Sequence, residues 1–182
     1  MTVLVVAEAV VIALLGILVI GLLRRNSEIL RGLGAAGLPV SDASGTGTMA
    51  RDIAGMGLNG KVVGIRVREP DAPTLLAFMS TTCATCGHFW KRFGEAEALA
   101  TLGDTRLIIV TYGSDRERPE HVAEVAPAGI PLVMSSIAWQ TYAIPGSPYF
   151  VIISAETGLI TAKDSAPNWD GLVSLIGREA GA

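Results

Sequence analysis

Residues 74–86, with the sequence TLLAFMSTTCATC, join a short apolar run to the two cysteines of the chain. Residues 75–79 carry only apolar side chains, as expected of a strand that is buried on both faces of a sheet. Residues 80–83 are predicted to form a polar loop, and a helix is predicted from about Cys83 to Leu102. Cys83 and Cys86 are therefore expected at the junction between a buried strand and the N-terminus of a helix.

The spacing of the two cysteines favours redox chemistry. Free N–H groups and the positive end of the helix dipole favour an anion at a helix N-terminus. A thiolate is such an anion, so we expect the pKa of Cys83 to be lowered and its sulfur to be nucleophilic near neutral pH. Cys86 lies one turn further on and can close a disulfide with Cys83. This would make Cys83 the attacking sulfur and Cys86 the resolving one.

Two alternative roles for the cysteine pair fit the sequence less well, and a third role is excluded. The cysteines could be inert core residues, but a loop at a helix N-terminus is too exposed to favour this. They could bind zinc with His88 and His121, the two histidines of the chain, although structural zinc commonly takes two closely spaced ligand pairs. A c-type haem needs a histidine directly after the second cysteine, where Gly87 stands. We therefore expect no metal and no cofactor.

The remaining sequence alternates short apolar runs with helical segments. Such alternation indicates parallel central strands with helices on both faces, and a hairpin near the C-terminus adds antiparallel strands. The predicted fold class is α/β, a three-layer sandwich with a mixed sheet. The expected strands are 62–67, 74–79, 107–112, 130–134, 149–153 and 159–162, and the later helices are 119–126, 136–142 and 170–180.

The segment 143–151, AIPGSPYFV, places Pro148 directly before a predicted strand. A bond to proline is the only peptide bond for which the cis form costs little, so Ser147–Pro148 is a candidate cis bond, with an ordinary trans turn as the alternative. A buried strand leading into Cys-x-x-Cys on a helix, followed by Gly-x-Pro and a hairpin, resembles the thioredoxin superfamily. The resemblance implies a cis proline that faces the cysteines, with the backbone of Ser147 binding the substrate chain.

Several features depart from the pattern of that superfamily. Thr82 stands where many thioredoxins have tryptophan, and Ala84-Thr85 is not the usual dipeptide between the cysteines. This dipeptide tunes the reduction potential, so reductant, oxidant and isomerase all remain open. The buried acid that assists proton transfer in many thioredoxins is not identifiable from the sequence.

Two alternative functions share this fold. One is a non-catalytic accessory subunit of a membrane complex, although such a domain often loses a cysteine and this chain keeps both. The other is a peroxiredoxin-like peroxidase. Peroxidases place a proline shortly before the attacking cysteine, and Thr81-Thr82 does not supply one.

The N-terminal segment predicts a membrane anchor. Val3 to Leu23 carry a single charge, Glu8, and a helix of that length covers roughly 31 Å, which matches a hydrocarbon core of about 30 Å. The expected organisation is one transmembrane helix at residues 1–24, a juxtamembrane stalk and linker at 25–60, and the thioredoxin-like domain at 61–182. This arrangement is similar to membrane-tethered TlpA-type proteins, and among them to the MauD proteins.

The expected partners are a protein dithiol or disulfide and the membrane, crossed once. The resemblance also implies a redox partner or complex in the membrane, and a domain on the extracytoplasmic side, which we expect. Arg24, Arg25 and Arg31 follow the predicted span and favour the cytoplasmic side instead. The net charge is −3 and no basic cluster is interleaved with aromatics, which excludes nucleic-acid binding.

Overall fold

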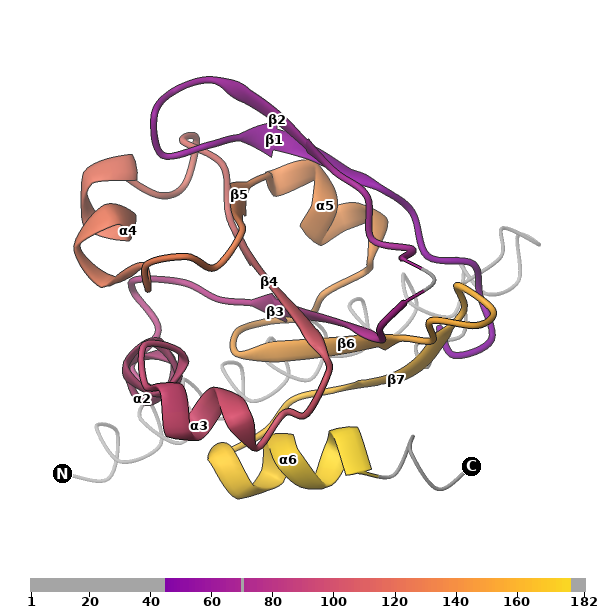
Figure 1. Cartoon of the computed structure of the whole chain (residues 1–182). Helices are drawn as coiled ribbons and strands as arrows, with labels where there is room; N and C mark the ends of the chain where they lie inside the picture. Colours follow the sequence, from indigo (N-terminus) through magenta and orange to yellow (C-terminus); the bar gives the residue numbers. More distant parts are fainter. Residues whose placement is uncertain (1–44, 70, 178–182) are drawn as a thin grey trace, which may run out of the picture. The chain divides into compact units, whose positions relative to one another are not determined.

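The computed structural model describes residues 45–69 and 71–177, and their strands form one sheet in the order β2-β1-β5-β4-β3-β6-β7 (Figure 1). The strands are β1 (Ile53–Met56), β2 (Val62–Ile65), β3 (Thr74–Phe78), β4 (Arg106–Thr111), β5 (Leu132–Met134), β6 (Tyr149–Ile153) and β7 (Ile160–Asp164). The helices are α2 (Cys86–Phe93), α3 (Ala96–Ala100), α4 (Pro119–Val125), α5 (Ser136–Thr141) and α6 (Trp169–Gly177).

The sheet is mixed, as the sequence predicts. β4 pairs in parallel with both β3 and β5 at the centre of the sheet. β6 runs antiparallel to β3, and β7 runs antiparallel to β6, so the predicted C-terminal hairpin forms one side. β1 pairs antiparallel with β5 and with β2 at the other side. The α/β class with a mixed sheet is confirmed.

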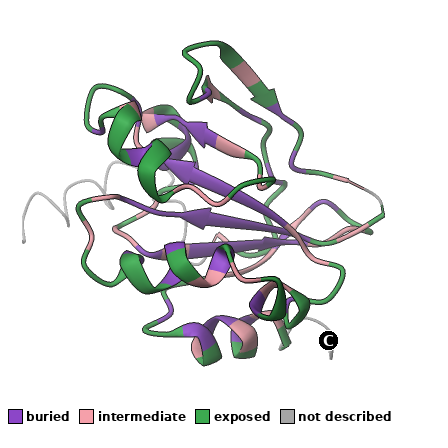
Figure 2. Cartoon of the chain, turned by 60° about the vertical axis from the view of Figure 1, so that its left-hand side comes forward, coloured by how far each residue is buried: buried purple, intermediate pink, exposed green. Residues whose placement is uncertain are grey.

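Two apolar clusters cover the two faces of the central strands, which Figure 2 colours as buried. Alternate residues of a strand point to opposite faces, so Leu75 and Ala77 of β3 join one cluster while Leu76 and Phe78 join the other. Side chains of α2, α3 and α6 complete the first cluster, and side chains of α5 complete the second. The result is the predicted three-layer sandwich.

The helix predicted over residues 83–102 differs from the observed one in two ways. It begins at Cys86, because Cys83 to Thr85 form a turn in which the Cys86 N–H donates to the Cys83 carbonyl oxygen at 3.1 Å. It is also broken at Gly94 and Glu95, so that α2 and α3 are separate helices. Glu95 adopts an extended backbone conformation, which ends the regular helical hydrogen bonding.

The strand β1 is not predicted from the sequence. It lies at residues 53–56, inside the range assigned to the stalk and linker. Its sequence, IAGM, has one fully buried side chain, Ile53, and is otherwise small or exposed, so it carries no alternating pattern. The strand exists because its backbone pairs with β2 and β5, which local composition does not reveal.

The predicted membrane span at residues 3–23 lies outside the described residues, as do Glu8, Arg24, Arg25 and Arg31. Across the portions 45–69 and 71–177, none of the helices has the length and apolar character needed to cross a bilayer.

Candidate redox site

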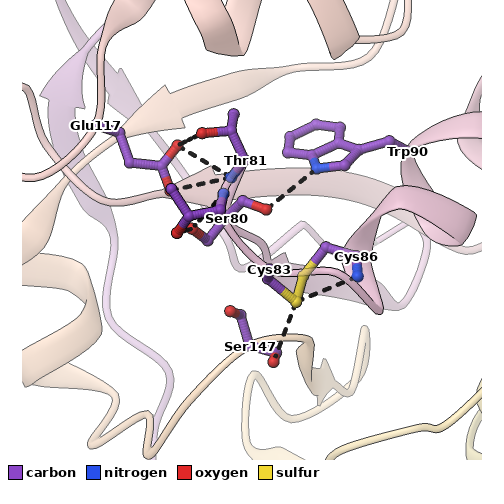
Figure 3. The surroundings of a disulfide bond; sticks show 8 residues. Ser80, Thr81, Cys83, Cys86, Trp90, Glu117 and Ser147 are labelled. Carbon is purple, nitrogen blue, oxygen red and sulfur yellow. Dashed lines mark hydrogen bonds between the residues drawn. A yellow bond between two sulfur atoms is a disulfide. The ribbon is translucent and has the colours of Figure 1, made fainter.

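Cys83 and Cys86 form a disulfide at the end of β3 that leads into α2 (Figure 3). Their Cα atoms are 5.3 Å apart. The apolar strand β3 is fully buried and fixes the position of the loop that follows it, while Cys86 is the first residue of α2. The two cysteines are therefore held between a buried central strand of the sheet and the first turn of a helix.

The two sulfur-bearing residues differ in exposure. Cys86 is fully buried, with an exposed fraction of 0%, whereas Cys83 is only partly buried. The Cys86 N–H also donates a hydrogen bond to Cys83 Sγ at 3.2 Å. A donor at this position stabilises negative charge on the Cys83 sulfur. An incoming thiolate can therefore reach Cys83 but not Cys86.

The loop before β6 lies beside Cys83. The bond between Ser147 and Pro148 is cis, which confirms that prediction, and the Ser147 carbonyl oxygen lies 3.3 Å from Cys83 Sγ. The topology explains the contact, because Phe78 at the end of β3 pairs with Tyr149 at the start of β6. The residues that follow β3 and those that precede β6 thus lie at the same end of these two strands, and Figure 3 shows Ser147 beside Cys83.

A buried carboxylate, Glu117, contacts the loop between β3 and the cysteines and is not predicted from the sequence. Its exposed fraction is 5%. Its oxygens accept hydrogen bonds from the Thr81 N–H at 3.2 and 3.3 Å and from Thr81 Oγ1 at 3.0 Å. Glu117 stands between Arg116 and Arg118 in the sequence, a run of charges that is typical of a solvated loop, so no sequence signal marks it as buried.

The opposite side of the same loop contacts α2. Trp90 is buried, and its Nε1 donates to the Ser80 carbonyl oxygen at 3.5 Å, a long hydrogen bond. The Ser80 hydroxyl accepts from the Thr82 N–H at 3.2 Å. The residues before Cys83 are therefore held from both sides, by Glu117 and by Trp90 (Figure 3).

The histidines considered as zinc ligands lie on different helices. His88 is on α2 and His121 is on α4, and both are exposed. Within the described ranges, no three side chains of the kinds that bind metals are grouped so that they could hold an ion.

Comparison with known proteins matches the fold but gives no family assignment. No family model matches the chain, and no curated protein matches it. Solved structures do match it. One is the thioredoxin domain of a thiol-disulfide oxidoreductase from Bacteroides vulgatus, with a TM-score of 0.52 and 21% identity, covering 74% of this chain and 96% of that one.

Two further similar structures are those of an exposed lipoprotein and of a secreted protein. The exposed lipoprotein thioredoxin of Streptococcus pneumoniae gives a TM-score of 0.56 at 15% identity over 70% of this chain and 99% of that one. A secreted disulfide oxidoreductase of Mycobacterium tuberculosis gives a TM-score of 0.55 at 16% identity, covering 69% of this chain and 95% of that one. The chain has a thioredoxin-like fold. Identities this low establish the fold alone, so the chemistry of the site follows from its own residues.

Proposed function

We propose that this thioredoxin-like chain is a thiol–disulfide oxidoreductase that exchanges its Cys83–Cys86 pair with a dithiol or disulfide of a partner protein. The observation that carries the proposal is the asymmetry of the pair. Cys83 is accessible and receives a hydrogen bond from the Cys86 N–H, and Cys86 is buried next to it. This is the arrangement that exchange requires, with one sulfur open to the partner and the other positioned to resolve the intermediate.

The exchange starts from the disulfide form present in the structure. A partner thiolate attacks Cys83 Sγ, a new bond forms between the two proteins, and Cys86 leaves as a thiolate with the electron pair of the broken bond. The second partner thiolate then attacks the partner's own sulfur in the mixed disulfide, and Cys83 leaves. The partner is oxidised to a disulfide, and Cys83 and Cys86 are reduced to thiols after taking up two protons. The reverse sequence reduces a partner disulfide.

Ser147 and Pro148 are proposed to bind the partner chain. The Ser147 carbonyl oxygen lies 3.3 Å from Cys83 Sγ, so a peptide whose sulfur reaches Cys83 also passes the backbone of Ser147. An extended peptide can pair with such a backbone through main-chain hydrogen bonds, which depend little on its sequence. Pro148 is buried and forms the base of this loop rather than its outer surface.

The domain is further proposed to lie on the extracytoplasmic side of a membrane, tethered by one span at residues 3–23, as in TlpA-type and MauD proteins. The support is the apolar N-terminal sequence, together with the similarity in fold to one exposed lipoprotein and one secreted protein. A reporter that is active on one side of the membrane only, fused after Ala182, tests the location. Activity of a cytoplasm-specific reporter would contradict it, in line with Arg24, Arg25 and Arg31.

Turnover by the oxidised and reduced protein tests the exchange itself. The full-length protein is incubated with a protein disulfide such as insulin and a limiting dithiol, and reduction of insulin is followed by turbidity. We expect wild type to accelerate the reaction and Cys83→Ser to abolish the acceleration. Cys86→Ser should stop turnover but accumulate an adduct on Cys83. No acceleration by wild type would favour a non-catalytic accessory subunit instead.

A further inference from the structure

We propose that Glu117 is a positioning residue for the redox pair, which holds Cys83 through Thr81; this inference rests on the proposed function. Thr81 lies two residues before Cys83, on the short loop that joins β3 to the disulfide. The Glu117 carboxylate oxygens accept hydrogen bonds from both the N–H and the hydroxyl of Thr81, with donor–acceptor distances of 3.0 to 3.3 Å. Figure 3 shows the carboxylate turned toward this loop.

Glu117 is buried, and its carboxylate is hydrogen-bonded by Thr81. Neither of the two ion pairs found in residues 45–69 and 71–177 includes Glu117. An ionised carboxylate that is removed from water without an ion pair is costly unless hydrogen bonds replace its hydration. Here the hydrogen bonds that replace it come from Thr81, so the favourable interactions of Glu117 are concentrated on the residues next to Cys83.

The loop that carries Glu117 is itself fixed, so it can act as an anchor. The Glu117 N–H donates to the Gly113 carbonyl oxygen at 2.9 Å, which closes a tight turn after β4. Ser136, at the start of α5, binds two residues of that turn: its hydroxyl donates to Asp115 at 2.7 Å and accepts from the Gly113 N–H at 3.0 Å. The Arg116 guanidinium lies 3.9 Å from the centre of the Tyr112 ring. The turn after β4 thus joins α5 to the redox loop.

Fixing Cys83 has a measurable effect on disulfide formation. In the reduced protein, closure of the disulfide depends on how often Cys83 Sγ lies within reach of Cys86, which is an effective concentration. Removing the anchor allows Cys83 to occupy more positions, so the dithiol form gains entropy and the disulfide form becomes less favoured. Cys83 also lies less often beside the Ser147 backbone. Exchange with protein substrates, which bind that backbone, should therefore slow more than reaction with small reagents.

The test compares Glu117→Ala with Glu120→Ala, which removes an exposed acid three residues away on α4. Each protein is equilibrated with reduced and oxidised glutathione, under conditions where urea titration shows it to be folded. We expect the equilibrium constant for disulfide formation to fall by about twofold or more in Glu117→Ala, because Cys83 occupies more positions in the dithiol form and its effective concentration beside Cys86 drops. Glu120→Ala should match wild type, and equal constants in all three proteins would overturn the inference.

Two further variants keep the test decisive if Glu117→Ala does not fold. Thr81→Val removes the hydroxyl donor and retains the N–H, so it should shift the glutathione equilibrium in the same direction by less. Where Glu117→Ala does fold, adding Thr81→Val to it should shift the equilibrium little further, because the two changes remove the same interaction. Glu117→Gln keeps the length of the side chain and one acceptor oxygen, so its equilibrium constant should lie between those of Glu117→Ala and wild type. A constant no higher than that of Glu117→Ala, or no shift in Thr81→Val, would contradict the positioning role.

Failure of the positioning role differs from failure of the proposed function. If wild type neither equilibrates with glutathione nor exchanges with insulin, the proposed function is wrong. If wild type does both and Glu117→Ala behaves the same, the proposed function stands and the positioning role is wrong.

Discussion

The difference in exposure between the two cysteines predicts a large difference in their reactivity. When the reduced protein meets a small amount of iodoacetamide at pH 7, we expect Cys83 to be alkylated at least about 100-fold faster than Cys86. Two effects contribute to this ratio. The hydrogen bond from the Cys86 N–H to Cys83 Sγ, at 3.2 Å, favours the Cys83 thiolate, and a bond of this kind contributes about 1.5–3 kcal/mol. Cys86, with an exposed fraction of 0%, can react only after a local opening.

The assay is peptide mapping by mass spectrometry after a short reaction. Both cysteines lie on the tryptic peptide 69–91, because no lysine or arginine separates Arg68 from Lys91, so fragmentation must locate the label. The variants Cys83→Ser and Cys86→Ser, alkylated under the same conditions, give the rate of each cysteine alone. Equal labelling of the two cysteines, or faster labelling of Cys86, would refute the assignment of Cys83 as the attacking sulfur.

Three predictions concern stability, each measured by urea unfolding. A Cβ on Gly55 would overlap with the Met134 carbonyl oxygen, whereas one on Gly64 would meet nothing within 4 Å. Gly55→Ala should therefore cost about 2–4 kcal/mol and Gly64→Ala less than about 0.5 kcal/mol, and equal costs would contradict this packing. Burial raises the pKa of Tyr142 to about 12, above its value in the unfolded chain, so stability should fall as pH rises from 10 toward 12. In Tyr142→Phe the decrease in the free energy of unfolding between pH 10 and 12 should be smaller by up to about 2 kcal/mol. The same decrease in the variant and in wild type would contradict this role of Tyr142. Ala143 has a φ of 47°, so Ala143→Gly should stabilise the protein by about 1 kcal/mol, and a loss of stability would show that the alanine side chain is needed there.

The features that could be predicted from the sequence depend on local pattern. The buried strand β3 and its neighbour β4 are continuous apolar runs, which are recognisable without tertiary information. The pairing of Cys83 with Cys86 follows from their spacing, and the cis bond at Pro148 from a proline placed just before a strand. These residues form the main part of the candidate site, which could therefore be predicted from the sequence.

The features that were missed depend on contacts between distant parts of the chain. β1 is a strand because its backbone pairs with β2 and, through the long-range pairing of Met56 with Met134, with β5. Glu117 is buried because it accepts hydrogen bonds from Thr81, 36 residues before it. None of these contacts leaves a period or a motif in the sequence.

Trapping the mixed disulfide tests most directly whether Cys83 exchanges its sulfur bond with a partner while Cys86 resolves it. Cys86→Ala is mixed with a peptide that contains one disulfide, and the product is analysed by mass spectrometry before and after reduction. We expect one adduct, attached to Cys83 and released by reductant, that does not form with Cys83→Ala. The absence of an adduct on Cys86→Ala, under conditions where wild type reduces the same peptide, would contradict these roles.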